Sequence, residues 1–283
     1  MIQTVDEVAL TVLVEHALAE DVGSGDIAGR LIPETAKGFG RFLVKSPGVI
    51  AGLGVAQSVF AALDPTLTFH MLAQEGDFVK RGQVVAAVTG PCRSILSGER
   101  VALNFLQHMS GIATLTRRFV IAVAGTHAII LDTRQTAPGL RLVEHWAVQL
   151  GGGQNHHRGQ YDAVVIKERH IVAAHNISAA VNQIRAQLGA RRLPIEVEVT
   201  TLAELTETLP LGVDRITLNN MSLVEMRQAV ALTARQIPLQ ASGNVSLETV
   251  GAIAATGVDY ICVEAITQAA RALDIGLELD MGG

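Results

Sequence analysis

The chain has 283 residues, of which 49% are hydrophobic and 17% are charged. A chain of this length and composition can bury a large core, which excludes a disordered protein and favours two domains or one barrel with an attached module. The net charge of −5 and the aromatic content of 4% argue against a protein that binds nucleic acid or an anionic membrane.

The cysteines and the N-terminal residues bear on the cellular compartment. Cys92 and Cys262 are the only cysteines, and two thiols so far apart in sequence form neither a disulfide framework nor a zinc motif. Residues 1–7 are acidic and lack the basic start of a secretory signal. The most apolar stretch, 120–131, is too short to span a bilayer. We therefore expect a cytoplasmic protein.

The N-terminal part begins with helical spacing and then changes to short strands. Apolar residues predict a first helix over 4–19. Alternating runs broken by glycine predict strands at 40–44 and 83–88, with a reversal at 76–82. Residues 93–114 have one apolar face and predict a helix, and we place a domain boundary within or just after it.

From about residue 127, short apolar runs alternate with longer helical patterns. The runs predict strands at 128–131, 163–166, 195–199, 215–218, 238–242 and 260–263. Helical patterns between them include 178–188, 202–209, 222–235 and 246–256. This succession of βα units implies a parallel sheet with covering helices, and the number of units favours closure into a barrel or partial barrel.

That architecture also predicts where the chemistry takes place, because the active sites of such barrels lie at the C-terminal ends of the strands. The polar residues that end the expected strands are Asp132-Thr133-Arg134, Lys167, Glu198, Asn219-Asn220, Ser242-Gly243-Asn244 and Glu264. We expect these residues to converge on one mouth.

Basic residues are frequent at one end of the expected barrel, namely Arg134, His156, His157, Arg158 and Lys167. Guanidinium groups bind planar anions through paired hydrogen bonds, so this set suits a carboxylate or phosphate ligand. The alternative is a solvated rim that binds no ligand. The preceding run Gly151–Gly153 would let the backbone approach a ligand closely, but such a run also occurs in ordinary loops.

Glu196 and Glu198 lie at alternate positions of one expected strand and therefore face the same side. Two interpretations of Glu198, which is nearer the strand end, stay open: it holds a metal-bound phosphate, or it forms a structural ion pair with Lys167. The adjacent His156 and His157 do not have a spacing typical of metal ligands, so we expect no tightly bound metal.

Short motifs are spread over nearly the whole chain: Glu20–Asp26, Ser97–Arg100, Ala102–Gln107, Ser110–Thr114, Asp132–Arg141, Gly151–Gly153, Tyr161–Ala163, Ile166-Lys167, Glu196–Glu198 and Ala272–Ile275. Each motif alone is unspecific. Taken together, they resemble the quinolinate phosphoribosyltransferase family, also called carboxylating nicotinate-nucleotide pyrophosphorylases.

The resemblance implies an α/β fold in which an N-terminal mixed α/β sandwich precedes an open α/β barrel of about seven strands. We place the sandwich at residues 1–112, joined by the C-terminal tail 272–283, and the barrel that carries the site at 113–271. The resemblance also implies at least a homodimer, in which Arg100 of one subunit reaches the site of the other.

Members of that family condense quinolinate with phosphoribosyl pyrophosphate and Mg²⁺, and they release pyrophosphate and CO₂ to give nicotinate mononucleotide. By motif match, Arg100, Arg134, His156 and Lys167 would hold the quinolinate carboxylates, and Glu198 would lie near the ribose and the metal. The expected catalytic residues are therefore Lys167, Glu198 and His156. The remaining expected substrate contacts are His157, Arg158, Asn219, Ser242, Gly243, Asn244 and Glu264. Fixed cations suit both a dianionic aromatic acid and the charge that develops on its ring during decarboxylation.

Five positions depart from the family pattern that the resemblance implies. Gln135 replaces a lysine, and His157 replaces an arginine that recurs one place further along. Asn219 replaces an aspartate expected to help hold Mg²⁺, and Asn244 replaces the second glycine of a pair. Glu264 replaces a glycine beside the 5′-phosphate, where a carboxylate would repel the phosphate dianion and occupy its space.

Three hypotheses follow from the motifs and the departures. The first is a quinolinate phosphoribosyltransferase with an altered phosphate site. The second is a paralogue that has lost the use of phosphoribosyl pyrophosphate and decarboxylates or otherwise transforms a pyridine-like or related polycarboxylic acid. In that case the ring nitrogen is protonated, and His156, His157 or Glu264 is the candidate acid. The third is a non-catalytic carboxylate-binding protein. Mg²⁺ is the expected cofactor of the first, and no cofactor is expected for the others.

Overall fold

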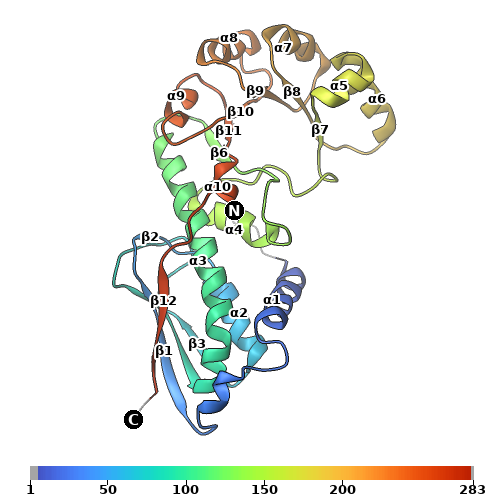
Figure 1. The fold of residues 1–283 in the computed structure, drawn as a ribbon. Coiled ribbons are helices and arrows are strands. Elements are labelled where there is room, and N and C mark those ends of the chain that lie inside the picture. Colours follow the sequence, from blue (N-terminus) through green and yellow to red (C-terminus); the bar gives the residue numbers. More distant parts are fainter. Residues whose placement is uncertain (1–5, 282–283) are drawn as a thin grey trace. The chain divides into compact units, whose positions relative to one another are not determined.

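A computed structural model describes residues 6–281 and divides the chain into two compact units (Figure 1). The first unit comprises the described residues up to 117, residues 136–152 and the residues from 269 on. The second comprises 118–135 and 153–268. Each unit is therefore assembled from segments far apart in the sequence, and the domain limits placed at 112 and 271 stay predictions. The start of the first expected helix, at positions 4 and 5, lies outside the described residues.

The first unit contains an antiparallel sheet with the strand order β12-β1-β5-β3. Its strands are β1 (Lys37–Val44), β3 (Thr68–Met71), β5 (Val84–Pro91) and β12 (Ile275–Asp280), while β2 (Gly48–Val49) pairs separately with β4 (Phe78–Val79). The rings of Phe42, Phe60 and Phe69 pack against one another with centroids 5.7 to 6.1 Å apart. These apolar contacts form part of the core of the unit.

The helices of the first unit are α1 (Glu7–Asp21), the 3-10 helix η1 (Ala28–Leu31), α2 (Leu53–Leu63) and α4 (Arg141–Gly151), together with α3 (Cys92–Ala122), which ends in the second unit. The helix α3 is longer than the expected 93–114 because buried Phe119 extends its apolar face. A Cβ atom on Gly111 of α3 would overlap the backbone oxygen of Arg271, so glycine is required where the C-terminal segment crosses this helix.

The second unit contains a six-stranded parallel sheet with the order β6-β11-β10-β9-β8-β7. A single bridge joins Leu131 to Gln154 beside β6, and within residues 6–281 no pairing joins β7 back to β6, so the sheet is open. Each expected run forms one strand: β6 (Ile129–Leu131), β7 (Val164–Ile166), β8 (Ile195–Val199), β9 (Arg215–Asn219), β10 (Leu239–Ser242) and β11 (Tyr260–Cys262). The α/β class and the parallel C-terminal sheet are confirmed.

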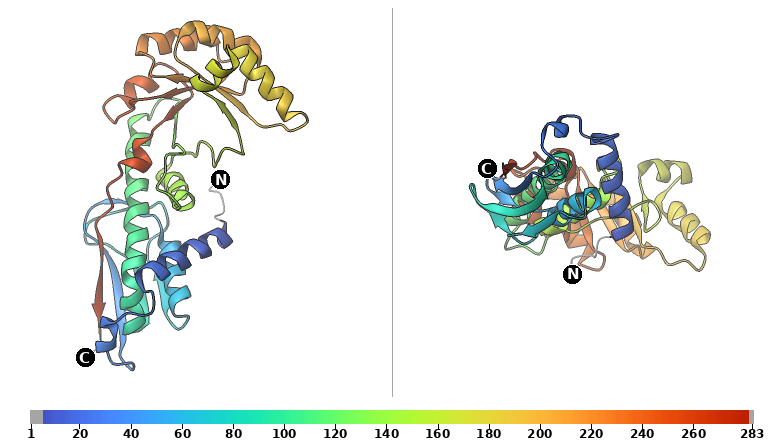
Figure 2. Two further views of the ribbon diagram at one scale, coloured as in Figure 1. Left: turned by 45° about the vertical axis from the view of Figure 1, so that its right-hand side comes forward. Right: turned by 90° about the horizontal axis from the view of Figure 1, so that it is seen from below.

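Figure 2 shows the helices of the second unit along one face of its sheet. They are α5 (Glu168–Ala174), α6 (Ile177–Leu188), α7 (Leu202–Thr208), the 3-10 helix η2 (Leu209–Leu211), α8 (Leu223–Thr233) and α9 (Val250–Ala254), while the short α10 (Ala265–Gln268) follows β11 apart from them. The expected helix 246–256 is shorter because the hydroxyls of Ser246 and Thr249 accept backbone N–H bonds and form a turn before α9. None of the helices within the described residues is long and apolar enough to cross a membrane.

Candidate active site

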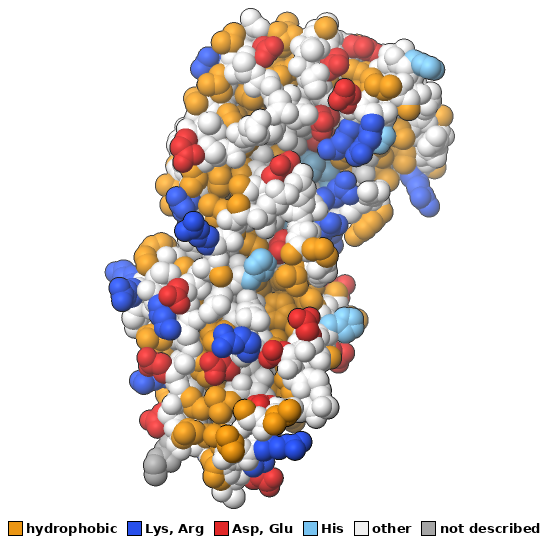
Figure 3. Space-filling model, viewed as in Figure 1, with side chains coloured by type: hydrophobic (Ala, Val, Ile, Leu, Met, Phe, Trp, Pro, Cys, Tyr) orange, Lys and Arg blue, Asp and Glu red, His pale blue; other side chains and the backbone are white. Residues whose placement is uncertain are grey.

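The C-terminal ends of the parallel strands carry nearly all of the expected site residues, and these residues belong to the second unit. Figure 3 shows basic, acidic and histidine side chains gathered on one face of this unit. In strand order, the expected site residues are Arg134 after β6, His156 to Arg158 after the bridge at Gln154, Glu264 after β11, Ser242 to Asn244 at the end of β10, Asn219 at the end of β9, Glu198 in β8 and Lys167 after β7.

A row of polar contacts, which we call the strand-end ladder, joins Lys167, Glu198, Asn219, Asn220 and Asn244. Lys167 Nζ lies 3.2 Å from Glu198 Oε2, and Asn219 Nδ2 donates to Glu198 Oε1 over 3.1 Å. Asn220 Nδ2 donates to Asn219 Oδ1 over 3.2 Å, and Asn244 Nδ2 donates to Asn220 Oδ1 over 3.1 Å. The ion pair that was one of two interpretations of Glu198 is therefore present. An aspartate at 219 would place a second carboxylate against Glu198, whereas the amide donates a hydrogen bond to it.

The backbone at the end of β10 explains how asparagine fits at position 244. Gly243 has a φ of 94°, and a Cβ atom there would overlap the side chain of Asn220. Asn220 and Asn244 have φ values of 55° and 51°, in the left-handed region that asparagine tolerates better than most residues. Ser242 contributes its backbone oxygen, which accepts from Asn220 N over 2.9 Å. The departure at Asn244 is therefore compatible with this turn.

Gln135 and Glu264, two of the positions that depart from the family pattern, contact each other. Gln135 Nε2 donates to Glu264 Oε1 over 2.9 Å, and Gln268 Nε2 donates to Gln135 Oε1. Thr267 Oγ1 donates to the backbone oxygen of Gln135 over 2.7 Å. Because Gln135 is neutral, this contact positions the exposed carboxylate of Glu264 without cancelling its charge.

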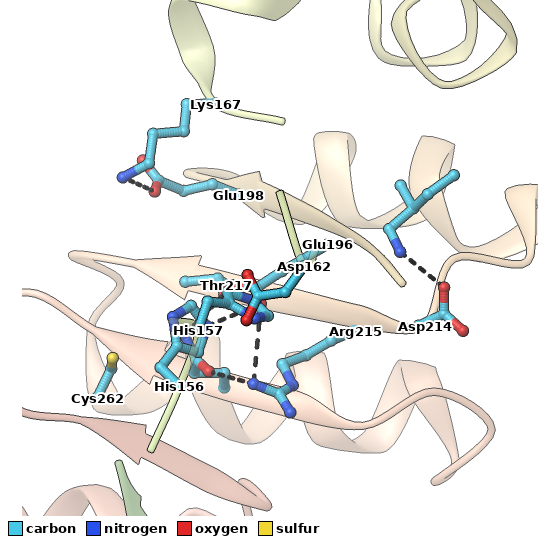
Figure 4. Close-up of polar contacts among 12 residues, drawn as sticks. His156, His157, Asp162, Lys167, Glu196, Glu198, Asp214, Arg215, Thr217 and Cys262 are labelled. Carbon is cyan, nitrogen blue, oxygen red and sulfur yellow. Dashed lines mark hydrogen bonds and ion pairs between the residues drawn. The ribbon is translucent and has the colours of Figure 1, made fainter. Parts of the chain in front are cut away.

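A buried polar cluster lies around Glu196, two residues before Glu198 (Figure 4). Glu196 is only 3% exposed. The Nε2 atoms of His156 and His157 lie 2.9 and 3.2 Å from Glu196 Oε2. Thr217 Oγ1 donates to Glu196 Oε1 over 2.5 Å. We call His156, His157 and Glu196 the two-histidine cluster.

The hydrogen bonds keep Glu196 ionised despite its burial. Burial alone would raise the pKa of this carboxyl, but the hydrogen bonds from His156, His157 and Thr217 outweigh it and hold the pKa well below its usual range. With Glu196 negatively charged, both histidine Nε2 atoms act as donors to it.

Arg215 and Asp132 lie on the border of this cluster. Arg215 Nη1 is 3.8 Å from Glu196 Oε2, donates to Gln240 Oε1 over 3.0 Å and belongs to a guanidinium stacked 4.4 Å from the ring centre of Tyr260. Asp132, which is fully buried, accepts from the backbone N of His156 over 2.8 Å. Asp132 therefore fixes the segment that carries both histidines.

The thiol of Cys262 completes this buried region. Its Sγ donates to the backbone oxygen of Asp132 over 2.9 Å. Burial raises the pKa of the Cys262 thiol, and the nearby carboxylates of Glu196 and Asp132 raise it further. The thiol is therefore protonated and unsuited to nucleophilic attack.

Sequence reasoning assigned the functional role to Glu198 and missed the partners that gather around Glu196. One signal in the sequence could have indicated this cluster: each of three neighbouring strands carries a polar residue in its interior. Glu198 on β8 is in register with Thr217 on β9, and Thr217 is in register with Gln240 on β10. Polar side chains inside the buried strands of a parallel sheet require partners, and here they find one another.

A cavity of about 510 Å³ lies beside β7, α5 and α6 within the second unit. Arg134 and Lys167 line it, so the structure brings these two expected cations to one cavity. Its other lining residues include the basic Arg169 and His170 and the apolar Ala163, Val165, Ile166, Ala174 and Ile184. A pocket with an apolar wall and a few cations suits a planar aromatic acid.

Arg158 and Arg100 do not take part in the contacts described above. The backbone N of Arg158 donates to Asp162 Oδ2 over 2.8 Å, in an exposed turn. Arg100 lies exposed on α3 in the first unit. Its expected role across a subunit boundary stays a prediction.

Comparison with known proteins identifies relatives over nearly the whole length of the chain. Residues 26–110 and 112–278 match the N-terminal and C-terminal domain models of quinolinate phosphoribosyl transferase. The chain is 42% identical to quinolinate phosphoribosyltransferase [decarboxylating] 1 of Nicotiana glauca, over 95% of this chain and 81% of that protein. It is 43% identical to the probable nicotinate-nucleotide pyrophosphorylase [carboxylating] of Synechocystis, over 93% of this chain and 90% of that protein.

The solved structures agree with this assignment. The nicotinate-nucleotide pyrophosphorylase of Francisella tularensis superposes with a TM-score of 0.94 at 35% identity, covering 99% of both chains. Both family models, the curated relatives and the fold thus lead to one conclusion: the chain belongs to the quinolinate phosphoribosyltransferase family.

Proposed function

We propose that the chain transfers a phosphoribosyl group from phosphoribosyl pyrophosphate to quinolinate and forms nicotinate mononucleotide, pyrophosphate and CO₂. The observation that carries the proposal is the cavity beside β7, α5 and α6, where Arg134 and Lys167 lie beside an apolar wall. The activity named for the curated relatives supports it. No observation favours the paralogue or the non-catalytic protein.

In this proposal, Arg134 and Lys167 bind the two carboxylates of quinolinate while the apolar wall contacts its ring. Lys167 pairs with Glu198 at 3.2 Å, so the acid competes with Glu198 for the ammonium group. The lysine side chain is 41% exposed and has room to turn from one anion to the other. His156, whose side chain is 11% exposed, is the third expected contact.

The bound acid presents its ring nitrogen to the anomeric carbon of the donor. A bond forms between that nitrogen and the carbon as the bond from the carbon to the pyrophosphate oxygen breaks, and pyrophosphate leaves with the electron pair. The positively charged ring then accepts electron density, so the adjacent carboxylate leaves as CO₂. The ring carbon takes up a proton in its place. Fixed cations stabilise the negative charge in both steps.

The strand-end ladder fits Mg²⁺ only weakly. Its oxygen donors are one carboxylate, Glu198, and the amide oxygens of Asn219 and Asn220, and Mg²⁺ prefers oxygen ligands while keeping several waters. When bound here, Mg²⁺ would neutralise charge on the pyrophosphate group. We therefore expect Mg²⁺ to bind mainly together with the donor. A homodimer completed by Arg100 and a cytoplasmic location stay predictions from the sequence.

The test is a turnover assay with product analysis. The purified chain is incubated with quinolinate, phosphoribosyl pyrophosphate and Mg²⁺, and nicotinate mononucleotide, pyrophosphate and CO₂ are quantified. We expect the three products in equal amounts and none when the donor is omitted. CO₂ release without the donor would instead identify a decarboxylase. Binding of quinolinate with no product under any condition would identify a carboxylate-binding protein.

A further inference from the structure

The two-histidine cluster has a geometry that the sequence spacing conceals. Adjacent histidines normally diverge, but the rings of His156 and His157 lie 3.9 Å apart between centroids and are tilted by 50°. Both direct Nε2 toward Glu196 Oε2, as Figure 4 shows. One ligand atom of each of the three residues lies within 4.8 Å of the others.

These separations are close to those of ligands around a metal ion. Bonds of 2.0 to 2.2 Å in tetrahedral geometry place ligand atoms about 3.3 Å apart. The distances of 2.9 and 3.2 Å from the histidine nitrogens to the carboxylate oxygen need only small adjustments to reach that value. Two imidazoles and one carboxylate form a donor set that binds Zn²⁺ and leaves a position open.

The surroundings hold the ligands in place and leave a path to them. Glu196 is anchored through its other oxygen by Thr217, and the backbone of His156 is anchored by Asp132. The histidine side chains are 11% and 12% exposed, so part of each ring reaches the solvent. Second-sphere anchors of this kind fix metal ligands in position.

The local charge balance also permits a dication. Arg215 is the cation nearest to the carboxylate among the contacts described, at 3.8 Å, and it is held by Gln240 and stacked on Tyr260. Against it stand the carboxylates of Glu196 and Asp132. Arg215 lowers the affinity for a dication relative to a site without it.

We propose that His156, His157 and Glu196 bind one transition-metal dication of the zinc class. The imidazole ligands select Zn²⁺, Co²⁺ or Ni²⁺ over Mg²⁺, which requires oxygen donors. The site is thus distinct in chemistry from the oxygen-rich strand-end ladder. If His156 also holds the acid, as the proposed function has it, metal and quinolinate compete for this residue.

The experiment measures metal binding without any substrate, so its result is independent of the transferase assay. Metal-free protein is titrated with Co²⁺ while its visible ligand-field bands are recorded, and separately with Zn²⁺ by calorimetry. The H157R and H157Q variants each remove one ligand. The H127A variant serves as the matched control, since His127 is a half-exposed histidine of the second unit that lies 3.5 Å from Asp259. Thermal unfolding verifies that each variant is folded.

We expect about one Zn²⁺ per chain, Co²⁺ bands typical of four- or five-coordination, and no displacement by a large excess of Mg²⁺. Both His157 variants should weaken Zn²⁺ binding at least about tenfold, with H127A unchanged. The proposal is overturned if no Zn²⁺ binds at about 0.1 mM, a concentration far above that needed for sites of this kind. It is equally overturned if the folded His157 variants bind Zn²⁺ as tightly as the natural chain.

Discussion

Glu196 and Glu198 lie two residues apart on β8 and face the same side of the sheet, yet the structure places them in opposite situations. Glu196 is 3% exposed and accepts hydrogen bonds from both histidines and from Thr217. The side chain of Glu198 is 17% exposed, and its contacts with Lys167 and Asn219 lie at the strand end.

The difference shows that depth along a strand, rather than residue type, separates a carboxylate enclosed by protein donors from one that is partly open at the strand end. A shift of two residues moves a side chain by about 7 Å along the strand, from the interior to the mouth. The buried carboxylate positions the residues around it. The outer carboxylate has a partly exposed lysine as its partner and an edge facing solvent.

The largest expected effect is on stability and sets the two glutamates apart. E196Q should lower the free energy of unfolding by about 3 kcal/mol, because it leaves Arg215 and the donors around position 196 without the buried charge that they contact. E198Q should cost less than about 1 kcal/mol, since its ion pair is partly exposed. Urea unfolding at neutral pH measures both. Equal losses would contradict the difference between the two positions.

The pH dependence of stability should follow from the same contrast. Because the folded-state pKa of Glu196 lies below its ordinary value of 4.5, its carboxylate contributes stability above that pH. The contribution is lost as the pH falls below 4.5 toward the folded-state value. We expect the difference in unfolding free energy between the natural chain and E196Q to shrink between about pH 5 and about pH 3. A constant difference over this range would show that Glu196 is not held ionised.

The next largest effect concerns Lys167, which follows β7 and lines the cavity. K167M removes the ammonium group that pairs with Glu198 and lines the cavity, so kcat/KM for quinolinate should fall at least about 100-fold, or about 2.7 kcal/mol. K80M, on the exposed Lys80 of the first unit, is the matched control. Steady-state kinetics measure both variants. A decrease in kcat/KM of less than threefold in K167M would show that Lys167 does not bind quinolinate.

The smallest expected effect concerns the contact between Gln135 and Glu264. E264G removes a carboxylate that repels an anionic donor, so kcat/KM for phosphoribosyl pyrophosphate should rise about tenfold. E264Q keeps the size of the side chain and removes only its charge. A gain in both variants identifies charge as the cause, and a gain in E264G alone identifies the space that the side chain occupies. A loss of activity in both would show that Glu264 assists the reaction.

Much of the second unit could be predicted from its sequence, because its apolar runs are short, regularly spaced and separated by helical patterns. Each run became a strand, and the parallel order brought the residues after them to one edge. The buried role of Glu196 could not be predicted, since it depends on side-chain hydrogen bonds from Thr217 and Gln240 on the two neighbouring strands. Likewise, the contact between Gln135 and Glu264 joins positions 129 residues apart.

The grouping of α4 with the first unit has a similar explanation. The helix at residues 141–151 is not among those that we predicted, and the sides on which a helix packs are set by tertiary contacts. Gly151 lies against Thr116 and the backbone of Ala113, with no room for a Cβ atom. The only sequence signal of such a close approach between distant segments is the glycine itself. Because glycine also occurs in turns and loops, this signal does not identify the packing partner.

The proposed transferase activity requires that the natural chain, with Glu264 in place, bind both substrates. The decisive measurement is calorimetric titration with Mg²⁺ and phosphoribosyl pyrophosphate, alone and after saturation with quinolinate. We predict donor binding with a dissociation constant at or below about 100 µM, equivalent to roughly −5.5 kcal/mol. If quinolinate gives binding heat but the donor gives none in either titration, the proposed transferase activity is contradicted.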